Sequence, residues 1–596
     1  MSSTFYDVVI VGAGIAGALI SKRLTAKGMK VLLLEAGTTT ALNGEGYQQH
    51  LDTFYQANGK GAEAPWPPTK AAPQPDTADL RTGTGYFVQR GPDLYGSSYT
   101  RLAGGSTLHF LGVSLRMLPE DFRMKSLHGI SRDWPLRYED LEPYYSQAEH
   151  EIGVSANADE QSYLGISFAE GYDYPMERVP LSYSDEFLGG SVNGLNVKLE
   201  EESFKVRIRS YPAARNSLPR GTYKPIGMSG NAFQGGSGEA YLGQRCEGNT
   251  ACIPICPVQA KYNAGKTLSQ CLPEHFTLQA QSVASRVIFD HATGAVQGIE
   301  YKRYESAGQA SYQTHVAHGR YYVLAAHAVE NAKLMLASGV NGPNDSMGRT
   351  LMDHPTLYAW GLAPKAIGAY RGPQSTSGVE DFRGGGFRAR HAAFRFDVGN
   401  DGWRAATGAP DSLVAQAVKE GRHGHDLRQH LEAHLRRQLR LSIAVEQLPS
   451  RQNRVTINPK FVDALGNARP VIDYRIEDYT LEGMVAASEV AGKIFHAAGV
   501  EDFTDKTPSN WFPSVTHKDR TFHYHGMGHF AGTHAMGSDR TRSVVDRDQR
   551  CWEHPNLFMV GSGSFPTMGT SNPTLTLAAL ALRTADELLL TFRQAA

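Results

Sequence analysis

The chain has 596 residues, of which 41% are hydrophobic and 62 are glycine, and its formal net charge is −1 at pH 7. This length exceeds what one hydrophobic core commonly supports, so we expect a globular protein of at least two domains with many tight turns. The near-neutral charge, without a long basic or acidic run, argues against nucleic acid and anionic membrane surfaces as partners. No apolar stretch approaches the ~20 residues of a membrane span, and no signal peptide precedes Tyr6, so we expect a soluble chain without an export signal of its own.

Residues 6–37 predict a strand, a glycine turn, an amphipathic helix and a second strand. The turn has the pattern G-x-G-x-x-G, with Gly12 for the tight turn, Gly14 for close approach of a pyrophosphate and Gly17 for helix–strand packing. Glu35 ends the second strand, where a carboxylate accepts from ribose hydroxyls and would repel a 2′-phosphate. The alternative is a glycine-rich turn without a ligand. The order of the elements favours a dinucleotide site.

Later elements are irregular at first and regular afterwards. Residues 38–80 contain PWPP and show no periodicity, so we expect a lid, a partner surface or a solvated insertion. We further expect an acid-rich helix at 133–154, irregular strands and loops at 155–240, a helix-like run from the cysteines to Leu272, strands at 275–326, helices at 328–339 and 427–439, strands at 441–476 and a long apolar C-terminal helix. The strands at 275–326 suit a sheet that closes on the dinucleotide unit, and those at 441–476 suit the floor of a second domain.

A second glycine-rich stretch follows the irregular region. The pair Gly104–Gly105 precedes Ser106 and Thr107. Backbone donors without side chains, beside small hydroxyls, suit the close approach of a ring system or a phosphate.

Three of the five cysteines lie together in the pattern C-x5-C-x3-C, at Cys246, Cys252 and Cys256, with Pro257 after the last. Three thiolates from one loop suit an iron–sulfur cluster, whereas zinc would need a fourth ligand that the loop does not offer. A Cys246–Cys252 disulfide and simple free thiols are the alternatives. Cys271 and Cys551 are isolated, so we expect buried thiols there.

Five motifs accompany the N-terminal fingerprint along the chain. They are GGST at 104–107, LMDHP at 351–355, GHFAGTHAMG at 528–537, SVVD at 543–546 and GTSNPTLT at 569–576. Together they resemble the glucose–methanol–choline flavoprotein oxidoreductase family over nearly the whole chain. Within that family, RMKSLHGISRDWPLRYEDLEPYY and CIPICPVQAKYNAG are similar to the catalytic subunit of bacterial cytochrome-linked sugar dehydrogenases of the glucose, gluconate and glucoside type.

The resemblance implies an α/β fold with a Rossmann-type FAD-binding domain and a second α+β substrate domain built on an antiparallel sheet, as in p-hydroxybenzoate hydroxylase-like proteins. The FAD-binding domain would span 1–340, with an insertion at 38–98 and the cysteine loop at 246–256. The substrate-binding domain would span 341–516, and 517–596 would return to the FAD-binding domain. We expect residues 365–440 and the insertion to shape the substrate pocket.

The implied reaction is hydride transfer from an alcohol carbon to the flavin N5, with a base that takes the hydroxyl proton. The family pattern H-x-x-G-T falls on His529, which makes it the expected base, ahead of His525 and His534. Asn572 matches the second catalytic position, where an amide can hold the substrate hydroxyl. Asn572 could instead cap the last helix, because Pro573 occupies its first position.

The resemblance also implies the residues that contact FAD. They are Gly12, Gly14, Gly17, Glu35, Gly104, Gly105, Ser106, Thr107, His109, Val283, Gly561, Pro573 and Thr574. In pyranose oxidases of the family a histidine just after the Ser-Thr pair is bonded covalently to the flavin. His109 is displaced by one residue from that place, so we expect non-covalent FAD.

For the three cysteines the resemblance implies a [3Fe–4S] cluster that passes electrons to a cytochrome, with a small accessory subunit as a further partner. The substrate would be a sugar hydroxyl at C1, C2 or C3. Export with a partner would place the chain in the bacterial periplasm or at the periphery of the inner membrane, and otherwise it would be cytoplasmic. Two alternatives are a pyranose or C-glycoside oxidase that uses O2 and a non-redox lyase, since the family includes hydroxynitrile lyases.

Overall fold

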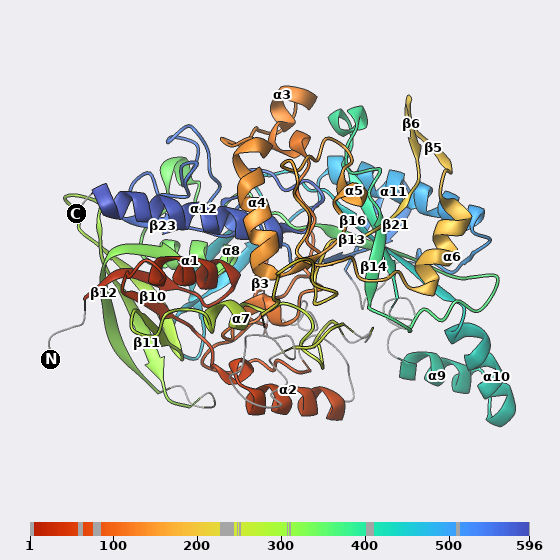
Figure 1. The fold of residues 1–596 in the computed structure, drawn as a ribbon, viewed down its shortest axis with the longest axis horizontal. Coiled ribbons are helices and arrows are strands. Elements are labelled where there is room, and N and C mark those ends of the chain that lie inside the picture. Colours follow the sequence, from red (N-terminus) through yellow and green to blue (C-terminus); the bar gives the residue numbers. More distant parts are fainter. Residues whose placement is uncertain are drawn as a thin grey trace.

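The computed structural model describes residues 5–57, 64–75, 85–226, 243–246, 248, 252–306, 308, 311–400, 410–507 and 513–594. Parts of the predicted insertion, of the cysteine loop and of 365–440 therefore lie outside the described residues. The described chain forms two seven-stranded sheets side by side, one at the left and one at the right of Figure 1, with helices packed around them. The expected α/β class is confirmed.

The first sheet has the strand order β10-β11-β12-β1-β2-β9, with β23 paired to β12. Its strands are β1 (Phe5–Val11), β2 (Val31–Leu34), β9 (Phe276–Gln279), β10 (Ser282–Phe289), β11 (Val296–Tyr304), β12 (Tyr312–Leu324) and β23 (Leu557–Met559). β12, β1, β2 and β9 run parallel, as do β12 and β23. Val8, Val9 and Ile10 are fully buried, which is the pattern of a parallel strand covered on both faces.

Glycines set the path from β1 into α1 (Ile15–Thr25). Gly12 has φ 103°, and a Cβ there would lie 2.6 Å from the carbonyl oxygen of Ala325. A Cβ on Gly17 would lie 2.0 Å from the carbonyl oxygen of Gly12. Any other residue at these positions would force the helix away from the sheet, so the fingerprint turn depends on them.

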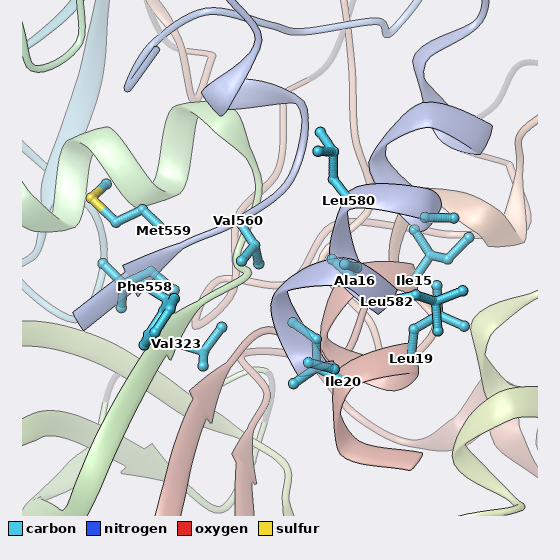
Figure 2. Packing of buried hydrophobic residues seen from close by; sticks show 14 of the residues in the cluster. Ile15, Ala16, Leu19, Ile20, Val323, Phe558, Met559, Val560, Leu580 and Leu582 are labelled. Carbon is cyan, nitrogen blue, oxygen red and sulfur yellow. The ribbon is translucent and has the colours of Figure 1, made fainter. Parts of the chain in front are cut away.

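Two helices far apart in the sequence cover this sheet. α12 (Pro573–Gln594) packs against α1, and Figure 2 shows Leu582 of α12 beside Ile15 and Leu19 of α1, with Leu580 on another side of α12. All four side chains are buried. The predicted C-terminal apolar helix therefore completes the core begun by the N-terminal fingerprint.

The second sheet has the order β19-β13-β16-β15-β14-β7, with β22 paired to β13. Its strands are β7 (Ile208–Ser210), β13 (Pro355–Leu362), β14 (Ser375–Val379), β15 (Phe394–Gly399), β16 (Gln438–Val445), β19 (Glu501–Asp502) and β22 (His525–Gly526). All of its pairings are antiparallel. The long helix α11 (Asp478–Ala497) packs against β13, β15 and β16. Strands at 441–476 were expected to form the floor of a second domain. β16 supplies the centre of this sheet, whereas β17 (Arg454–Val462) and β18 (Ala468–Asp473) pair in a separate three-stranded sheet with β3 (Val88–Gln89).

The remaining elements connect or extend these two sheets. The helices are α2 (Gly44–Gln56), α3 (Met124–His128), α4 (Tyr138–Ile152), α5 (Ala158–Gln161), α6 (Tyr183–Val192), α7 (Ala264–Leu268), α8 (Ala328–Ala337), α9 (Pro410–Lys419) and α10 (Gly424–Leu435). The strands are β3 (Val88–Gln89), β4 (Val154–Ser155), β5 (Asn196–Leu199), β6 (Glu202–Lys205), β8 (Ala213–Ala214), β17 (Arg454–Val462), β18 (Ala468–Asp473), β20 (Ser514–His517) and β21 (Arg520–His523). Among the described helices, none combines the length and apolarity needed to cross a membrane.

Four sequence-based expectations were wrong in detail. The stretch 38–80 contains α2, whose first turn is capped by the Asn43 side chain accepting from the Gly46 backbone N–H at 2.7 Å. The stretch 155–240 contains α6, capped in the same way by Ser182. The helix expected to reach Leu272 is limited to α7, and the helix expected at 427–439 ends at Leu435 because the next residues pair into β16.

Candidate active site

A cavity of about 760 Å³ is lined by residues of both sheets. At one end it is lined by Gly12, Gly14 and Glu35, and at the other by His529 and Asn572. The predicted site residues that line it are Gly12, Gly14, Glu35, Gly105, Ser106, Thr107, His109, Val283, Gly561, Pro573, Thr574, His529 and Asn572. The structure thus brings thirteen of the fifteen predicted cofactor and catalytic residues to one continuous space.

The dinucleotide end of the cavity fits a pyrophosphate and a ribose. A Cβ on Gly14 would meet no atom within 4 Å, so this backbone faces open space beside the N-terminus of α1. The Glu35 carboxylate is buried and accepts from the backbone N–H groups of Ala13 and Gly37, both at 2.8 Å. These bonds fix its position at the end of β2, where its remaining lone pairs can accept from a ribose.

The second glycine stretch packs against the fingerprint turn. A Cβ on Gly105 would lie 3.1 Å from Cα of Gly14, and Thr107 Oγ1 accepts from the Ala264 backbone N–H at 2.8 Å. Gly104 and Gly17 do not line the cavity. Gly104 instead has φ 106° and turns the chain into the short helix that follows, while Gly17 packs on β1. In this structure both glycines shape the backbone at the cofactor end, and their predicted contact with the cofactor stays a prediction.

His529 and Asn572 face each other across the catalytic end. The Asn572 side-chain nitrogen lies 3.2 Å from His529 Nε2. His529 follows β22, and Asn572 immediately precedes α12. Burial, together with His354 and Arg395 nearby, holds the pKa of His529 well below its usual value, so the imidazole is neutral at neutral pH.

A backbone bridge brings His354 beside His529. Met352 and Ala531 exchange two backbone hydrogen bonds of 3.0 Å, and β13 pairs with β22 a few residues away, at Pro355 and Gly526. The Nδ1 atoms of His354 and His529 are 2.8 Å apart. Asp353, also in this segment, accepts from the His529 backbone N–H at 3.1 Å.

The hydrogen bonds of His354 determine which nitrogen of His529 is basic. His354 Nε2 lies 2.8 Å from the carbonyl oxygen of Gly569, which can only accept, so the proton of His354 is on Nε2. Burial lowers the pKa of His354 to about 3, so its Nδ1 carries a lone pair and accepts from His529 Nδ1–H. His529 Nε2 is then the atom with a lone pair toward the cavity.

Arg395 orients Asn572. This buried arginine of β15 donates from Nη2 to Asn572 Oδ1 at 2.8 Å and from Nε to the Thr570 carbonyl oxygen at 2.8 Å. The amide oxygen is therefore occupied, which turns the NH2 group toward His529 and the cavity. Arg395 also forms an ion pair with Asp397. No spacing in the sequence indicated this arginine, because its partners come from another element.

The competing histidines have other surroundings. His534 is fully buried, does not line the cavity and contacts Thr533, which makes it a structural residue. His525 lines the cavity, with a pKa lowered to about 4 by burial, and its ring lies 5.8 Å from that of Tyr358. The Asn572 side chain contacts His529 instead. His109 lines the cofactor part, and burial lowers its pKa to about 4.

The catalytic end of the cavity has a polar floor supplied by the second sheet. Thr356 and Tyr358 of β13, Asp397 of β15, and Arg440 and Ser442 of β16 line it. The strand register places Ser442 directly between Tyr358 and Asp397. Four of the residues that line the cavity, Gln374, Ser375, Asp397 and Arg440, come from the predicted stretch 365–440.

The predicted insertion 38–98 contributes Gly96 and Ser98 to the cavity lining, whereas none of the described residues of its irregular part, 38–80, lines the cavity. Its helix α2 and Trp66 instead cover the cysteine loop: Tyr47 donates to the Cys256 carbonyl oxygen at 2.8 Å, and Trp66 donates to that of Pro254 at 3.0 Å. The described residues of 38–80 thus pack on the cysteine loop and not on the pocket that they were expected to shape, while 58–63 and 76–80 lie outside the described residues. An aromatic insertion packs on the loop because the loop carries Ile255, a fully buried apolar residue, toward it.

The cysteine loop borders the cavity but does not form a metal centre in the described structure. Ile253, next to Cys252, lines the cavity. Burial raises the pKa of Cys246, with smaller contributions from Cys252 and Cys256, so the three thiols are neighbours. None of the three forms a disulfide, which argues against the disulfide alternative, and the described residues contain no group of three side chains that could hold a metal ion. The described residues thus show no assembled ligand set, and the cluster stays a prediction from the cysteine spacing.

Three family models match the chain. GMC oxidoreductase models match residues 224–356 and 449–581, and an NAD(P)-binding Rossmann-like domain matches residues 10–69. The cavity described above is lined from all three segments.

Similar proteins cover almost the full length. The fructose dehydrogenase large subunit of Gluconobacter japonicus is 28% identical, over 99% of this chain and 98% of that protein. Paromamine 6'-oxidase of Streptomyces fradiae is 26% identical, over 97% of this chain and 90% of that protein. Among solved structures, pyridoxine 4-oxidase from Mesorbium loti superposes with a TM-score of 0.60 at 17% identity, covering 98% of this chain and 99% of that one, which supports the fold alone.

Proposed function

Because this chain belongs to the GMC oxidoreductase family, we propose that it oxidises a ring hydroxyl of a pyranose or glucoside by hydride transfer to FAD. The family implies FAD, and the glycine turn, Glu35 and the open space at Gly14 fit it. The observation that carries the proposal is the His529–Asn572 pair at the far end of the same cavity.

The geometry assigns a task to each side chain of the pair. FAD, when bound, supplies the hydride acceptor. His529 Nε2 takes the hydroxyl proton, since its Nδ1 proton is engaged with His354. Asn572 donates from its NH2 group to the substrate oxygen and holds it next to the base. Arg395 keeps that NH2 group in place by occupying the amide oxygen.

A sugar is the substrate class that the polar floor supports best. Thr356, Ser442 and Tyr358 offer hydroxyls, and Asp397 and Arg440 add a charge-assisted acceptor and donor. A ring with several hydroxyl groups can form hydrogen bonds with several members of such a set, whereas a simple apolar alcohol offers only one hydroxyl. The similarity to a fructose dehydrogenase large subunit and to a paromamine oxidase agrees with this class.

For the electron acceptor we propose an external carrier such as a cytochrome, reached with an accessory subunit and, if the pair is exported, in the periplasm. The spacing of the three cysteines and the contact of Ile253 with the cavity support an iron–sulfur relay at this wall. No step of the reaction above depends on that relay.

An oxidase that uses O2 is the second candidate. Two observations favour it: the similarity to paromamine 6'-oxidase, and the cysteines, which do not form a ligand group among the described residues. The pair His529–Asn572 would serve both enzymes in the same way, so the two candidates differ only in the oxidative half-reaction.

An anaerobic visible spectrum with iron analysis, before and after addition of glucose or a methyl glucoside, tests the proposal. We expect flavin bands that bleach with the sugar. About three irons per chain would support the dehydrogenase. Flavin without iron, turning over in air to peroxide, would support the oxidase, and absence of bleaching with every sugar would overturn the proposed substrate class.

A further inference from the structure

His327 has a backbone conformation that side chains rarely adopt. It lies between β12 and α8 with φ 104° and ψ 154°. In this region Cβ crowds the backbone, so glycine normally occupies it, and another residue persists only where its surroundings hold it there. Strain of this kind concentrates at active sites and ligand clamps.

Two aromatic rings fix the imidazole of His327. It stacks on Tyr99 with ring centroids 4.1 Å apart, and Phe530 meets it edge-on at 4.5 Å. Tyr99 is itself held, because its hydroxyl donates to Glu330 Oε1 at 2.5 Å and Glu330 pairs with Lys333 at 2.7 Å. The imidazole therefore has one defined orientation.

The backbone of α8 determines which nitrogen of His327 carries the proton. The Val329 backbone N–H donates to His327 Nδ1 at 3.4 Å, and burial lowers the pKa of the imidazole to about 4. In the neutral ring the proton is therefore on Nε2. Among the described residues none accepts a hydrogen bond from this Nε2, and the open space that His327 lines is the cavity.

His327 also lies where a dinucleotide approaches this fold. β12 pairs in parallel with β1 up to the register Val11–Leu324, and the Ala325 carbonyl oxygen packs against Gly12. His327 thus follows the carboxyl end of β12, beside the fingerprint turn. The carboxyl ends of parallel strands are the side on which nucleotides bind in such sheets.

We propose, on the assignment of FAD to this cavity, that His327 is a cofactor-binding residue whose Nε2–H donates to an oxygen acceptor of FAD. A glycine at this position would relieve the backbone but would supply no donor. The clamp of Tyr99 and Phe530 and the bond from Val329 orient a single N–H group toward the ligand before it binds, which lowers the entropic cost of binding.

Titration of FAD into apoprotein, followed by quenching of flavin fluorescence, tests this role without measuring activity. His327→Gly should bind FAD about three- to tenfold more weakly, the net worth of one hydrogen bond, while the thermal midpoint of the apoprotein rises as strain is relieved. Added imidazole should restore part of the affinity. His327→Phe keeps an aromatic ring in the clamp without a donor and should lose a similar factor.

Ser131→Gly is the matched control. Ser131 is exposed, has φ 58° and does not line the cavity, so its variant should raise the thermal midpoint and leave FAD affinity unchanged. Equal affinity of wild type, His327→Gly and His327→Phe would overturn the role of His327. Failure of the wild-type chain to bind FAD would instead overturn the proposed function.

Discussion

The histidine–asparagine pair and the cysteine loop border the same cavity, yet their side chains are held in different ways. His529 and Asn572 are oriented by His354, Arg395 and a backbone bridge between distant segments. The three cysteines share one short loop, and no such network gathers their thiols into a ligand group among the described residues. Tertiary contacts thus fix the orientation of both side chains of the His529–Asn572 pair, and the proposed proton transfer follows from that orientation. At the cysteine loop only the spacing of the thiols indicates a cluster, and iron analysis tests it.

The largest effect should follow removal of the base. His529→Ala should slow sugar-driven bleaching of the flavin by about 10²- to 10⁴-fold, because no other group takes the hydroxyl proton, while FAD stays bound. Anaerobic stopped-flow absorbance measures the rate. His517→Ala, on the exposed hairpin of β20 and β21, should react at the wild-type rate. A normal rate in His529→Ala would remove His529 from its role.

The next effect concerns the buried ion pair behind Asn572. Arg395→Leu should lower the free energy of unfolding by about 3–5 kcal/mol, because Asp397 is left buried without its cation and Asn572 loses its donor. Urea denaturation measures this. Arg520→Leu removes an ion pair that is about half exposed and should cost at most about 1 kcal/mol. Equal losses in the two variants would show that Arg395 is not the structural support that its contacts indicate.

The catalytic end shows which site residues the sequence could predict and which it could not. The sequence predicts His529 and Asn572 as candidates because each falls in a short motif. It predicts the cofactor end because a strand, glycines and an acid follow each other within one unit. Arg395 could not be found, since it contacts Asn572 across 177 positions of sequence. His354 was visible in LMDHP, but its task depends on the Met352–Ala531 bridge. The strained backbone of His327 leaves no trace in composition.

The part of the insertion that covers the cysteine loop likewise depends on contacts that the sequence does not reveal. Its helix was missed because glycines occupy positions 44 and 46 of its first turn, which weakens the helical pattern, although Asn43 caps it. Its docking on the cysteine loop depends on long-range contacts of Tyr47 and Trp66. Local patterns therefore predict which chemistry is present, whereas tertiary contacts decide which groups meet.

A smaller effect concerns the free energy of unfolding at acidic pH, which depends on histidines that are buried and neutral in the folded protein. The pKa values of His354 and His534 are lowered to about 3 by burial, whereas unfolded histidine titrates near 6.5. Between these values the unfolded state binds more protons, so stability is fully present above about pH 6.5. It is lost as pH falls, by about 1.4 kcal/mol per histidine per pH unit. Asp353, with a pKa raised to about 6 by burial, offsets part of this loss.

Unfolding free energies at pH 7.5, 6.5 and 5.5 measure the slope. His534→Leu removes one of the buried neutral histidines, one that does not line the cavity, and should flatten the slope by about 1.4 kcal/mol per pH unit below pH 6.5. Cys551→Ser, at a buried thiol elsewhere, should keep the wild-type slope. An unchanged slope in His534→Leu would mean that this histidine is already charged in the folded protein.

The smallest effect on the sugar half-reaction should come from the cysteine loop, and this is where the two regions separate. In Cys252→Ser the bleaching rate should stay within about twofold of wild type, because the Cys252 side chain does not line the cavity and the pair His529–Asn572 is untouched.

If the cluster hypothesis is right, the variant loses the iron of the wild type and its reduction of cytochrome c, whereas Cys551→Ser keeps both. Iron retained in Cys252→Ser would dismiss Cys252 as a ligand. Iron absent from the wild type would dismiss the cluster and leave oxygen as the acceptor to test. A bleaching rate that falls with the iron would instead show that the cysteine loop supports the catalytic end, and the two regions would then have to be treated as one site.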